Sequence, residues 1–143
     1  MHQKFVDIIT LLIHKNEKME DDLINSSDLN GITPKQLEVV DLIFRFHNPT
    51  ITELSGFLGI TKPSATVLID RLCEKKLTKR IKSDTDRRSA HLHLTQEGEK
   101  IAMLHKDLHT TFAKKLMGNL NRNEIQSLSE MLEKALQGIS NQD

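Results

Sequence analysis

Basic side chains gather in one short stretch of this sequence. Residues 75–88 contain seven Lys and Arg against two Asp, although the whole chain balances 20 basic against 20 acidic residues. The basic ones are Lys75, Lys76, Lys79, Arg80, Lys82, Arg87 and Arg88. A surface that faces nucleic-acid phosphates needs such a local excess of positive charge, whatever the total charge of the chain. The stretch therefore predicts a nucleic-acid partner.

Two histidines supply a second candidate for chemistry. His105 and His109 stand four residues apart in a segment with helical periodicity, so both imidazoles project from one helix face. This spacing can chelate a divalent metal, but two ligands alone do not make a site. The spacing leaves a metal site and an ordinary solvated pair both open.

Patterns typical of enzymes are missing. We find no nucleophile–base pair, phosphate-cradling glycine loop or acid dyad at recognisable spacing, and the six Gly fall at turns or helix ends. We therefore expect a binding protein and not an enzyme.

Length and composition narrow the class of protein further. The 143 residues suit one domain with its own core. No apolar run approaches the roughly 18 residues of a membrane span, and no signal-peptide pattern opens the chain. The lone Cys73 fits a reducing compartment. We expect a cytoplasmic protein without a membrane partner.

The apolar spacing predicts a mainly α fold of six helices with a small β wing. Thr33 and Thr61 are expected to cap the second and fourth helices, Thr50 or Thr52 to begin the third, and Gly59 to close it. The expected helices cover residues 3–25, 34–46, 50–58, 62–75, 96–116 and 121–139, and the strands 77–83 and 89–95. In the second helix, Leu37, Val40, Ile43 and Phe44 are expected to face inward.

The order of elements in residues 51–95 is helix, tight turn, helix and two-stranded basic wing. This is the order of a winged helix-turn-helix, which fits one helix into the DNA major groove and a β-ribbon tip against the neighbouring minor groove. We therefore expect a partner of double-stranded DNA, with residues 33–98 as the DNA-binding lobe.

The expected helix over residues 62–75 has an apolar face and a mainly polar face, because its apolar residues repeat at helical spacing. Ala65, Leu68, Ile69 and Leu72 should face the core. On the opposite face, Lys62, Ser64 and Thr66 can hydrogen-bond base edges, Val67 can meet a thymine methyl group, and Arg71 suits a phosphate.

In the wing, we expect one of Arg87 and Arg88 to enter the minor groove, where narrow A·T stretches attract guanidinium groups. The other can pair with Asp84 or Asp86 to hold the hairpin. The sequence leaves open which arginine points outward.

The two ends of the chain, residues 1–30 and 100–143, carry more apolar surface than the lobe needs for its own core. We expect these helices to build a homodimer interface. A dimer would place two recognition helices about 34 Å apart on a pseudo-palindromic operator.

Three features of the chain resemble the MarR family of bacterial transcription regulators. They are the helix order, the segment TKPSATVLIDRLCEKKL, and the wing SDTDRRSAHLHLTQEG with its D-x-R element, Asp86 and Arg88, before an L-T-x-x-G junction. The resemblance covers essentially the whole chain. It implies an obligate dimer, usually a repressor whose DNA affinity responds to a ligand, and it matches Arg88 to the recurrent wing arginine of the family.

The resemblance also suggests two effectors. Zinc-responsive members build a site from the first, second and fifth helices, and Glu20, Glu38, His105 and His109 fall on those positions, with Glu38 where His is typical. This set suits Zn²⁺, or Mn²⁺ or Fe²⁺ if water joins. The cysteine of the auxiliary site in those proteins has no equivalent, since Ser26 and Ser27 occupy that stretch.

The segment RRSAHLHLTQEGEKIAMLHKDLH is similar to fatty-acid-biosynthesis regulators of the same family, which respond to acyl chains. Leu12, Met19, Leu37 and Phe44 could line such a ligand cleft or simply form core. We expect a sequence-specific, ligand- or metal-responsive repressor. The alternatives are an acyl-responsive regulator and an architectural DNA binder without an effector.

Overall fold

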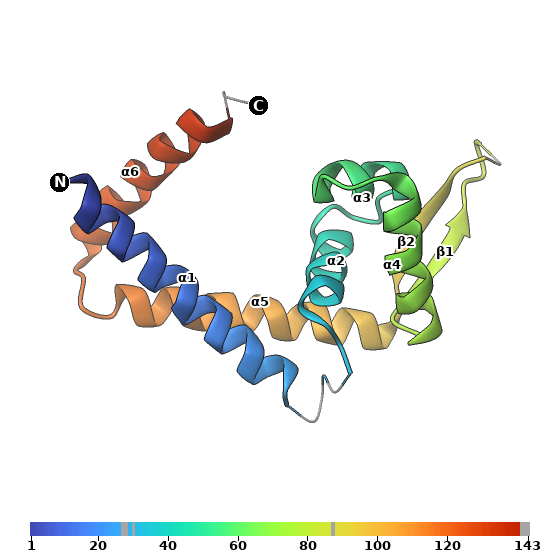
Figure 1. Ribbon diagram of the computed structural model, residues 1–143, viewed down its shortest axis with the longest axis horizontal. Coiled ribbons are helices and arrows are strands. Elements are labelled where there is room, and N and C mark those ends of the chain that lie inside the picture. Colours follow the sequence, from blue (N-terminus) through green and yellow to red (C-terminus); the bar gives the residue numbers. More distant parts are fainter. Residues whose placement is uncertain (27–28, 30, 87, 141–143) are drawn as a thin grey trace. The chain divides into compact units, whose positions relative to one another are not determined.

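The computed structural model describes residues 1–26, 29, 31–86 and 88–140. In these residues the fold is six helices and one two-stranded sheet, which confirms the predicted fold class (Figure 1). The elements are α1 His2–Ile24, α2 Pro34–Arg45, α3 Ile51–Leu58, α4 Lys62–Glu74, β1 Thr78–Lys82, β2 Ala90–Leu94, α5 Gln96–Met117 and α6 Arg122–Ser140.

The chain divides into two compact units, Met1–Leu108 and His109–Asp143. The first contains all elements from α1 to β2 and the start of α5, and the second contains the end of α5 and α6. The expectation of one domain over the whole chain stays a prediction. None of the described helices has the length and apolar character needed to cross a membrane.

Threonine side chains start helices α2, α3 and α4. Thr33 caps α2 and Thr50 caps α3, each in a reciprocal box with the side chain three residues later, and Thr61 caps α4. Thr50, and not Thr52, therefore begins the third helix. Gly59 ends α3 at φ +62°, a left-handed conformation that costs glycine little, as predicted.

The core of the first unit lies among α2, α3, α4 and the sheet, which Figure 1 shows gathered together. Leu37, Val40 and Ile43 of α2 are buried as predicted. Phe44, also expected inside, is 36% exposed. It follows Ile43 directly and is turned about 100° around the helix, so it falls at the edge of the buried stripe. The inward assignment of Phe44 was wrong.

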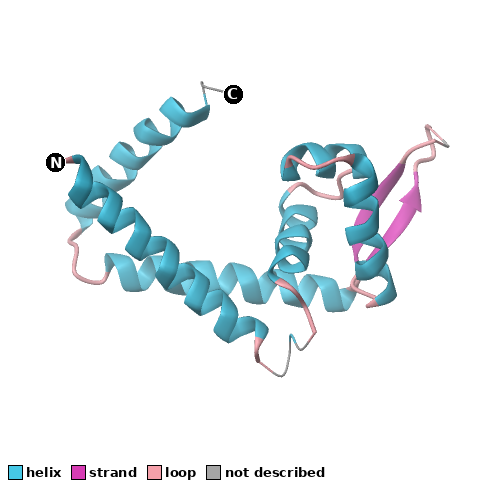
Figure 2. Ribbon diagram, viewed as in Figure 1, coloured by secondary structure: helices cyan, strands magenta, loops and turns pink. Residues whose placement is uncertain are grey.

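The wing is an antiparallel hairpin, drawn in magenta in Figure 2. Thr78 pairs with Leu94 at its base and Lys82 pairs with Ala90 near its tip. On β2, Leu92 and Leu94 are buried, so this strand anchors the hairpin to the core while most of β1 faces solvent. The anchored strand holds the basic tip in place beside α4.

Candidate nucleic-acid interface and histidine pocket

Helix α4 divides into a buried face and an exposed face, as the sequence predicts. Ala65, Ile69 and Leu72 are fully buried, and Leu68 is half-buried against the same core. These contacts fix the rotation of the helix. Its other face is therefore presented outward as a fixed surface.

The exposed face carries the side chains predicted to contact DNA. Lys62, Ser64, Val67 and Arg71 are exposed, and Val67 is 50% exposed although it is apolar. Thr66 is half-buried, and its hydroxyl donates to the Lys62 carbonyl oxygen at 2.9 Å. Since that proton is engaged, the Thr66 oxygen is left to accept a bond, for example from a base amino group.

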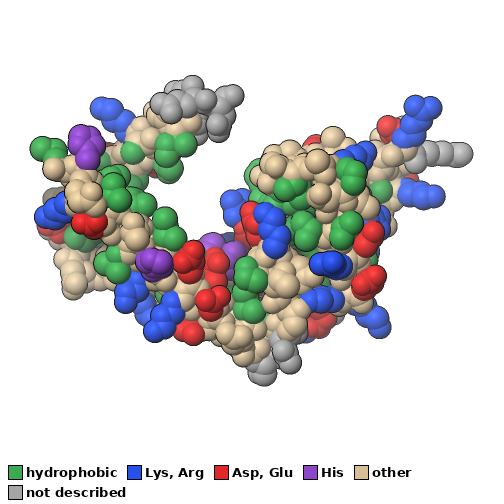
Figure 3. Space-filling model, viewed as in Figure 1, with side chains coloured by type: hydrophobic (Ala, Val, Ile, Leu, Met, Phe, Trp, Pro, Cys, Tyr) green, Lys and Arg blue, Asp and Glu red, His purple; other side chains and the backbone are tan. Residues whose placement is uncertain are grey.

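The wing tip is held by backbone hydrogen bonds. Asp86 accepts the Arg88 backbone N–H at Oδ1, 2.9 Å away, and its carbonyl oxygen accepts the Ser89 N–H at 3.1 Å. Asp86 thus holds the hairpin through the backbone of Arg88, whose side chain is exposed. Arg87 lies outside the described residues, so the choice between the two arginines stays a prediction. Figure 3 shows Lys and Arg side chains at this tip.

Two of the seven basic residues in the stretch 75–88 form contacts with other side chains or backbone groups of the same chain. The Lys75 ammonium donates to Gln36 Oε1 at 2.8 Å and to the Gly31 carbonyl oxygen, which joins the end of α4 to the start of α2. Arg80 pairs with Asp70 of α4. Sequence reasoning missed both contacts, because their partners are distant along the chain and no local pattern marks them.

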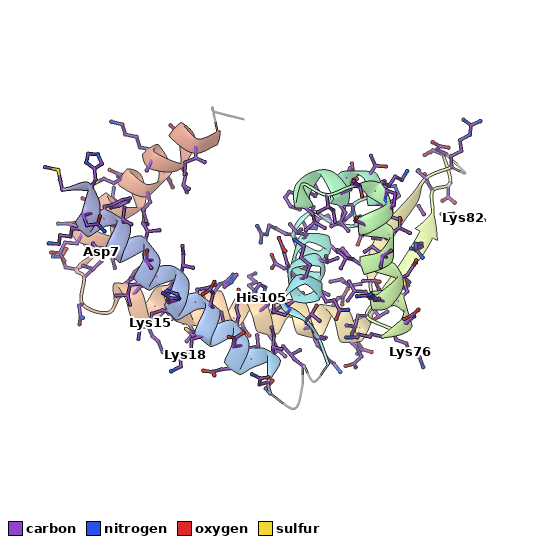
Figure 4. The ribbon with its side chains drawn as sticks, viewed as in Figure 1. Asp7, Lys15, Lys18, Lys76, Lys82 and His105 are labelled. Carbon is purple, nitrogen blue, oxygen red and sulfur yellow. The ribbon has the colours of Figure 1, made fainter. Side chains whose placement is uncertain are left out.

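A separate pocket of about 480 Å³ lies beside α2, and its lining includes Glu20, Glu38, Asp41, Arg45 and His105. His105 is 5% exposed. Its Nε2 lies 3.1 Å from Glu20 Oε1 of α1, and its Nδ1 lies 3.5 Å from Asp41 Oδ1 of α2, an ion-pair distance that is long for a hydrogen bond. Figure 4 shows His105 beside α2. One imidazole therefore connects three helices.

The charges around His105 shift the titration of both partners. The Asp41 carboxylate, followed by Glu20, raises the pKa of His105 above its ordinary value, and this outweighs the opposing effect of burial. His105 in turn holds the pKa of Asp41 below its ordinary value, against burial and with help from Arg45. Both shifts favour an imidazolium flanked by carboxylates.

The four predicted metal ligands differ in their positions and in their present partners. Glu20 and His105 lie within hydrogen-bond distance in the pocket. Glu38 lines the same pocket, but its carboxylate pairs with Lys35 Nζ at 2.7 Å. His109 follows one helical turn later on α5 and belongs to the second unit.

Asp41 was missed by sequence reasoning, which chose Glu38 as the residue of the second helix. The two carboxylates stand three residues apart, so both fit the same helix face. Asp41 falls on the buried part of that face, at 9% exposure, and Glu38 on the exposed part. The apolar residues around Asp41 are the signal that could have pointed to it.

The expected acyl-cleft residues are also separated in part. Leu37 lines the pocket beside His105, whereas Phe44 lines another hollow of about 200 Å³ next to Ile43 and Leu94. The lining of the histidine pocket is dominated by charged side chains.

Comparison with known proteins shows which family the chain is similar to. The family model described as MarR family matches residues 32–90, which span α2 to the start of β2. The fold matches FabT of Streptococcus pneumoniae, solved in complex with DNA, with a TM-score of 0.90 and 25% identity over 100% of both chains. The sequence from α2 to the start of β2 is therefore similar to the MarR family.

Two Bacillus subtilis regulators are similar to this chain in sequence. The HTH-type transcriptional regulator YsmB is 39% identical over 71 residues, which are 50% of this chain and 49% of YsmB. The HTH-type transcriptional repressor MdtR is 29% identical over 83 residues, which are 58% of this chain and 54% of MdtR. The chain thus spans about half the length of these two relatives. The names of both relatives are those of transcriptional regulators, in agreement with the expectation of a binding protein.

Proposed function

We propose that this protein is a MarR-family transcriptional regulator that binds double-stranded DNA in a sequence-specific manner. The observation that carries the proposal is the division of α4. Ala65, Ile69 and Leu72 lock one face into the core, and the other face presents Lys62, Ser64 and Val67 outward beside a basic wing. A helix fixed in this way suits the major groove, and the wing suits the adjacent minor groove.

The similar proteins support a repressor in particular. MdtR is a transcriptional repressor, and FabT was solved in complex with DNA. A bound protein represses by occupying its operator. We propose the same mode for this chain, acting in the cytoplasm where operator DNA lies.

Exposed apolar side chains support a homodimer. In α1 they include Phe5, Val6 and Leu11, each more than half exposed, and in α6 they include Leu136 and Ile139. Large apolar side chains repeated along a helix are costly to leave in water and mark an interaction surface. A second copy of this chain would cover them, and its two-fold symmetry would match a pseudo-palindromic operator.

Selection from random duplexes tests this function. We expect recovery of one inverted-repeat sequence, bound by a species of twice the chain mass in sedimentation. Binding to that sequence should survive excess random competitor DNA. Equal loss of specific and random complexes would instead indicate an architectural binder, and a monomer that ignores all duplexes would refute the proposal.

We propose the histidine pocket as the effector site, with a divalent cation as the ligand that its donors suit best. Glu20 and His105 offer carboxylate oxygen and imidazole nitrogen, which are donors typical of Zn²⁺. Glu38 could join if it released Lys35, and His109 projects from the same helix face as His105. A bound cation would replace the positive charge that the His105 imidazolium now places beside the Glu20 carboxylate.

Metal analysis of the purified protein tests this effector. We expect retained zinc after growth in zinc-replete medium, and its loss in a variant with His105→Ala and His109→Ala. His14→Ala serves as the matched control, because His14 is exposed and pairs with Glu17. Wild type without metal under these conditions would remove the cation from the proposal.

Acyl ligands remain the competing effector because residues 87–109 resemble fatty-acid-biosynthesis regulators, which respond to acyl chains. The charged lining of the pocket favours the cation, since an acyl chain would bury apolar surface against ion pairs. The same DNA-binding assay with Zn²⁺, Mn²⁺ or a long-chain acyl donor distinguishes them.

A further inference from the structure

A second, smaller hollow lies on the face that carries the predicted DNA contacts. It has a volume of about 200 Å³ and is lined by residues 50–52 at the start of α3, by Lys62 at the start of α4, and by residues 88–90 of the wing. Three separate elements therefore converge on it.

Hydrogen bonds fix the walls of this hollow relative to one another. The segment before α3 bonds to β2, because the Leu92 N–H donates to the Pro49 carbonyl oxygen at 2.9 Å and Thr50 forms a β-bridge with His91. His91 Nδ1 also lies 2.9 Å from the Asn48 carbonyl oxygen. Since these contacts join the α3 entry to the wing, the hollow is formed before any ligand arrives.

The hollow concentrates positive charge. Lys62 and Arg88 both line it, and within the described part of the chain neither side chain has a carboxylate at ion-pair distance. Lys35, Arg45, Arg80 and Lys100 all have such a partner. Two like charges facing one small space repel each other, and an anion between them removes that cost.

A nearby acid does not fill this role. The Glu53 carboxylate accepts the Thr50 backbone N–H at 2.8 Å and the Thr50 hydroxyl at 3.1 Å. The backbone hydrogen bond from Thr50 lowers the pKa of Glu53. Glu53 is thus engaged in capping α3 and leaves the hydroxyl of Thr52 to donate to a ligand, whereas the Ser89 hydroxyl donates to the Asp86 carbonyl oxygen at 3.4 Å.

We propose that this hollow holds one backbone phosphate of the DNA duplex, an inference that rests on the proposed DNA binding. Lys62 supplies a point charge, and Arg88 supplies a planar fork that fits two phosphate oxygens. A phosphate contact fixes the register of a protein on DNA but carries no sequence information directly. Lys62 and Arg88 are then positioning residues, and Lys62 does not read a base.

Neutral phosphate analogues test the proposal at single positions. Replacing each phosphate of the selected duplex in turn by methylphosphonate removes one charge at a time. For wild type, we expect one position per half-site at which affinity falls roughly tenfold through loss of charged hydrogen bonds to both side chains. In Lys62→Gln and in Arg88→Gln, that same position should become much less sensitive. Arg71→Gln is the matched control and should keep the full sensitivity there.

The salt dependence of binding gives a second, independent readout. The variant that combines Lys62→Gln with Arg88→Gln should reduce the slope of log K against log salt by about one unit, because the two side chains share one phosphate. Two separate phosphates would instead give a reduction of about two units. Lys62→Gln, Arg88→Gln and their combination replace exposed side chains. We therefore expect their loss of DNA affinity to occur without a change in the midpoint of unfolding.

The outcomes separate this inference from the function on which it rests. Different sensitive phosphates for Lys62 and Arg88, or a relaxed base preference in Lys62→Gln, would overturn the shared phosphate and leave DNA binding intact. A wild-type protein that binds no duplex would overturn the function and the inference together.

Discussion

Arg80 on β1 forms an ion pair with Asp70 on α4, with Nη2 2.5 Å from Oδ1. This contact joins the wing directly to the helix proposed to enter the major groove. The Arg80 side chain is 35% exposed and that of Asp70 is 51% exposed, so water screens the pair. Its contribution to stability should be small, of the order of 0–1 kcal/mol.

The two halves of this ion pair should affect DNA affinity in opposite directions. Asp70→Asn removes a negative charge near the phosphates and should strengthen binding to all duplexes, whereas Arg80→Gln removes a positive charge and should weaken it. Fluorescence anisotropy at several salt concentrations measures both changes. Glu97→Gln breaks the Lys100–Glu97 pair on α5 and serves as control. Equal effects of Asp70→Asn and Arg80→Gln would show that orientation of the wing, and not charge, dominates.

Gly98 at the start of α5 should tolerate no side chain. A Cβ there would meet the Leu77 carbonyl oxygen at 2.1 Å, and backbone cannot move aside cheaply. Gly98→Ala should therefore destabilise the protein by about 2 kcal/mol or more. Gly56→Ala is the matched control, since a Cβ in α3 meets nothing within 4 Å and alanine favours helix by about 0.5–1 kcal/mol. Chemical denaturation followed by circular dichroism measures both, and a similar loss in the two variants would contradict the packing argument.

Substitutions of Val67 and Ile69 should affect different properties, base preference for Val67 and stability for Ile69. Val67→Ala removes a half-exposed side chain and should change stability by less than about 0.5 kcal/mol, while altering base preference at one position of the site. Ile69→Ala removes a fully buried one and should cost about 2–5 kcal/mol. Denaturation and repeated duplex selection supply the two measurements. An unchanged selected sequence for Val67→Ala would place that side chain outside the base contacts.

His105 should make stability depend on pH in metal-free buffer. Its pKa in the folded protein is raised above 6.5, so its contribution is fully present below pH 6.5 and is lost as pH rises through the folded pKa. The pKa of Asp41 is lowered from 3.8, so its contribution is present above pH 3.8 and is lost as pH falls through the folded value. Unfolding free energies of wild type should therefore decrease on the alkaline side, and those of His105→Gln should not. His14→Gln should retain the wild-type profile, and an identical profile for His105→Gln would refute the buried ion pair.

Local chemistry allowed much of the fold to be predicted from sequence. Thr33 and Thr61 cap helices because their hydroxyls reach a backbone N–H three residues later, and Gly59 ends α3 because it adopts positive φ at little cost. The two faces of α4 follow from a 3.6-residue period. These interactions join residues close along the chain, so a short segment contains all the information.

Interactions between distant segments required the tertiary structure. Whether α2 offers Glu38 or Asp41 to His105 depends on the rotation of one helix against another by a fraction of a turn. The Arg80–Asp70 pair, the Lys75–Gln36 bond and the hollow shared by Lys62 and Arg88 depend likewise on how separate elements pack.

The amino-acid order by itself determined the helices, the wing, the outward face of α4 and the resemblance of the chain to a family of regulators. Only the tertiary structure decided which charged side chains meet each other and which remain available to DNA. The physical reason is that secondary structure arises from short-range backbone geometry and side-chain periodicity, whereas charge pairing acts through space between residues that packing brings together.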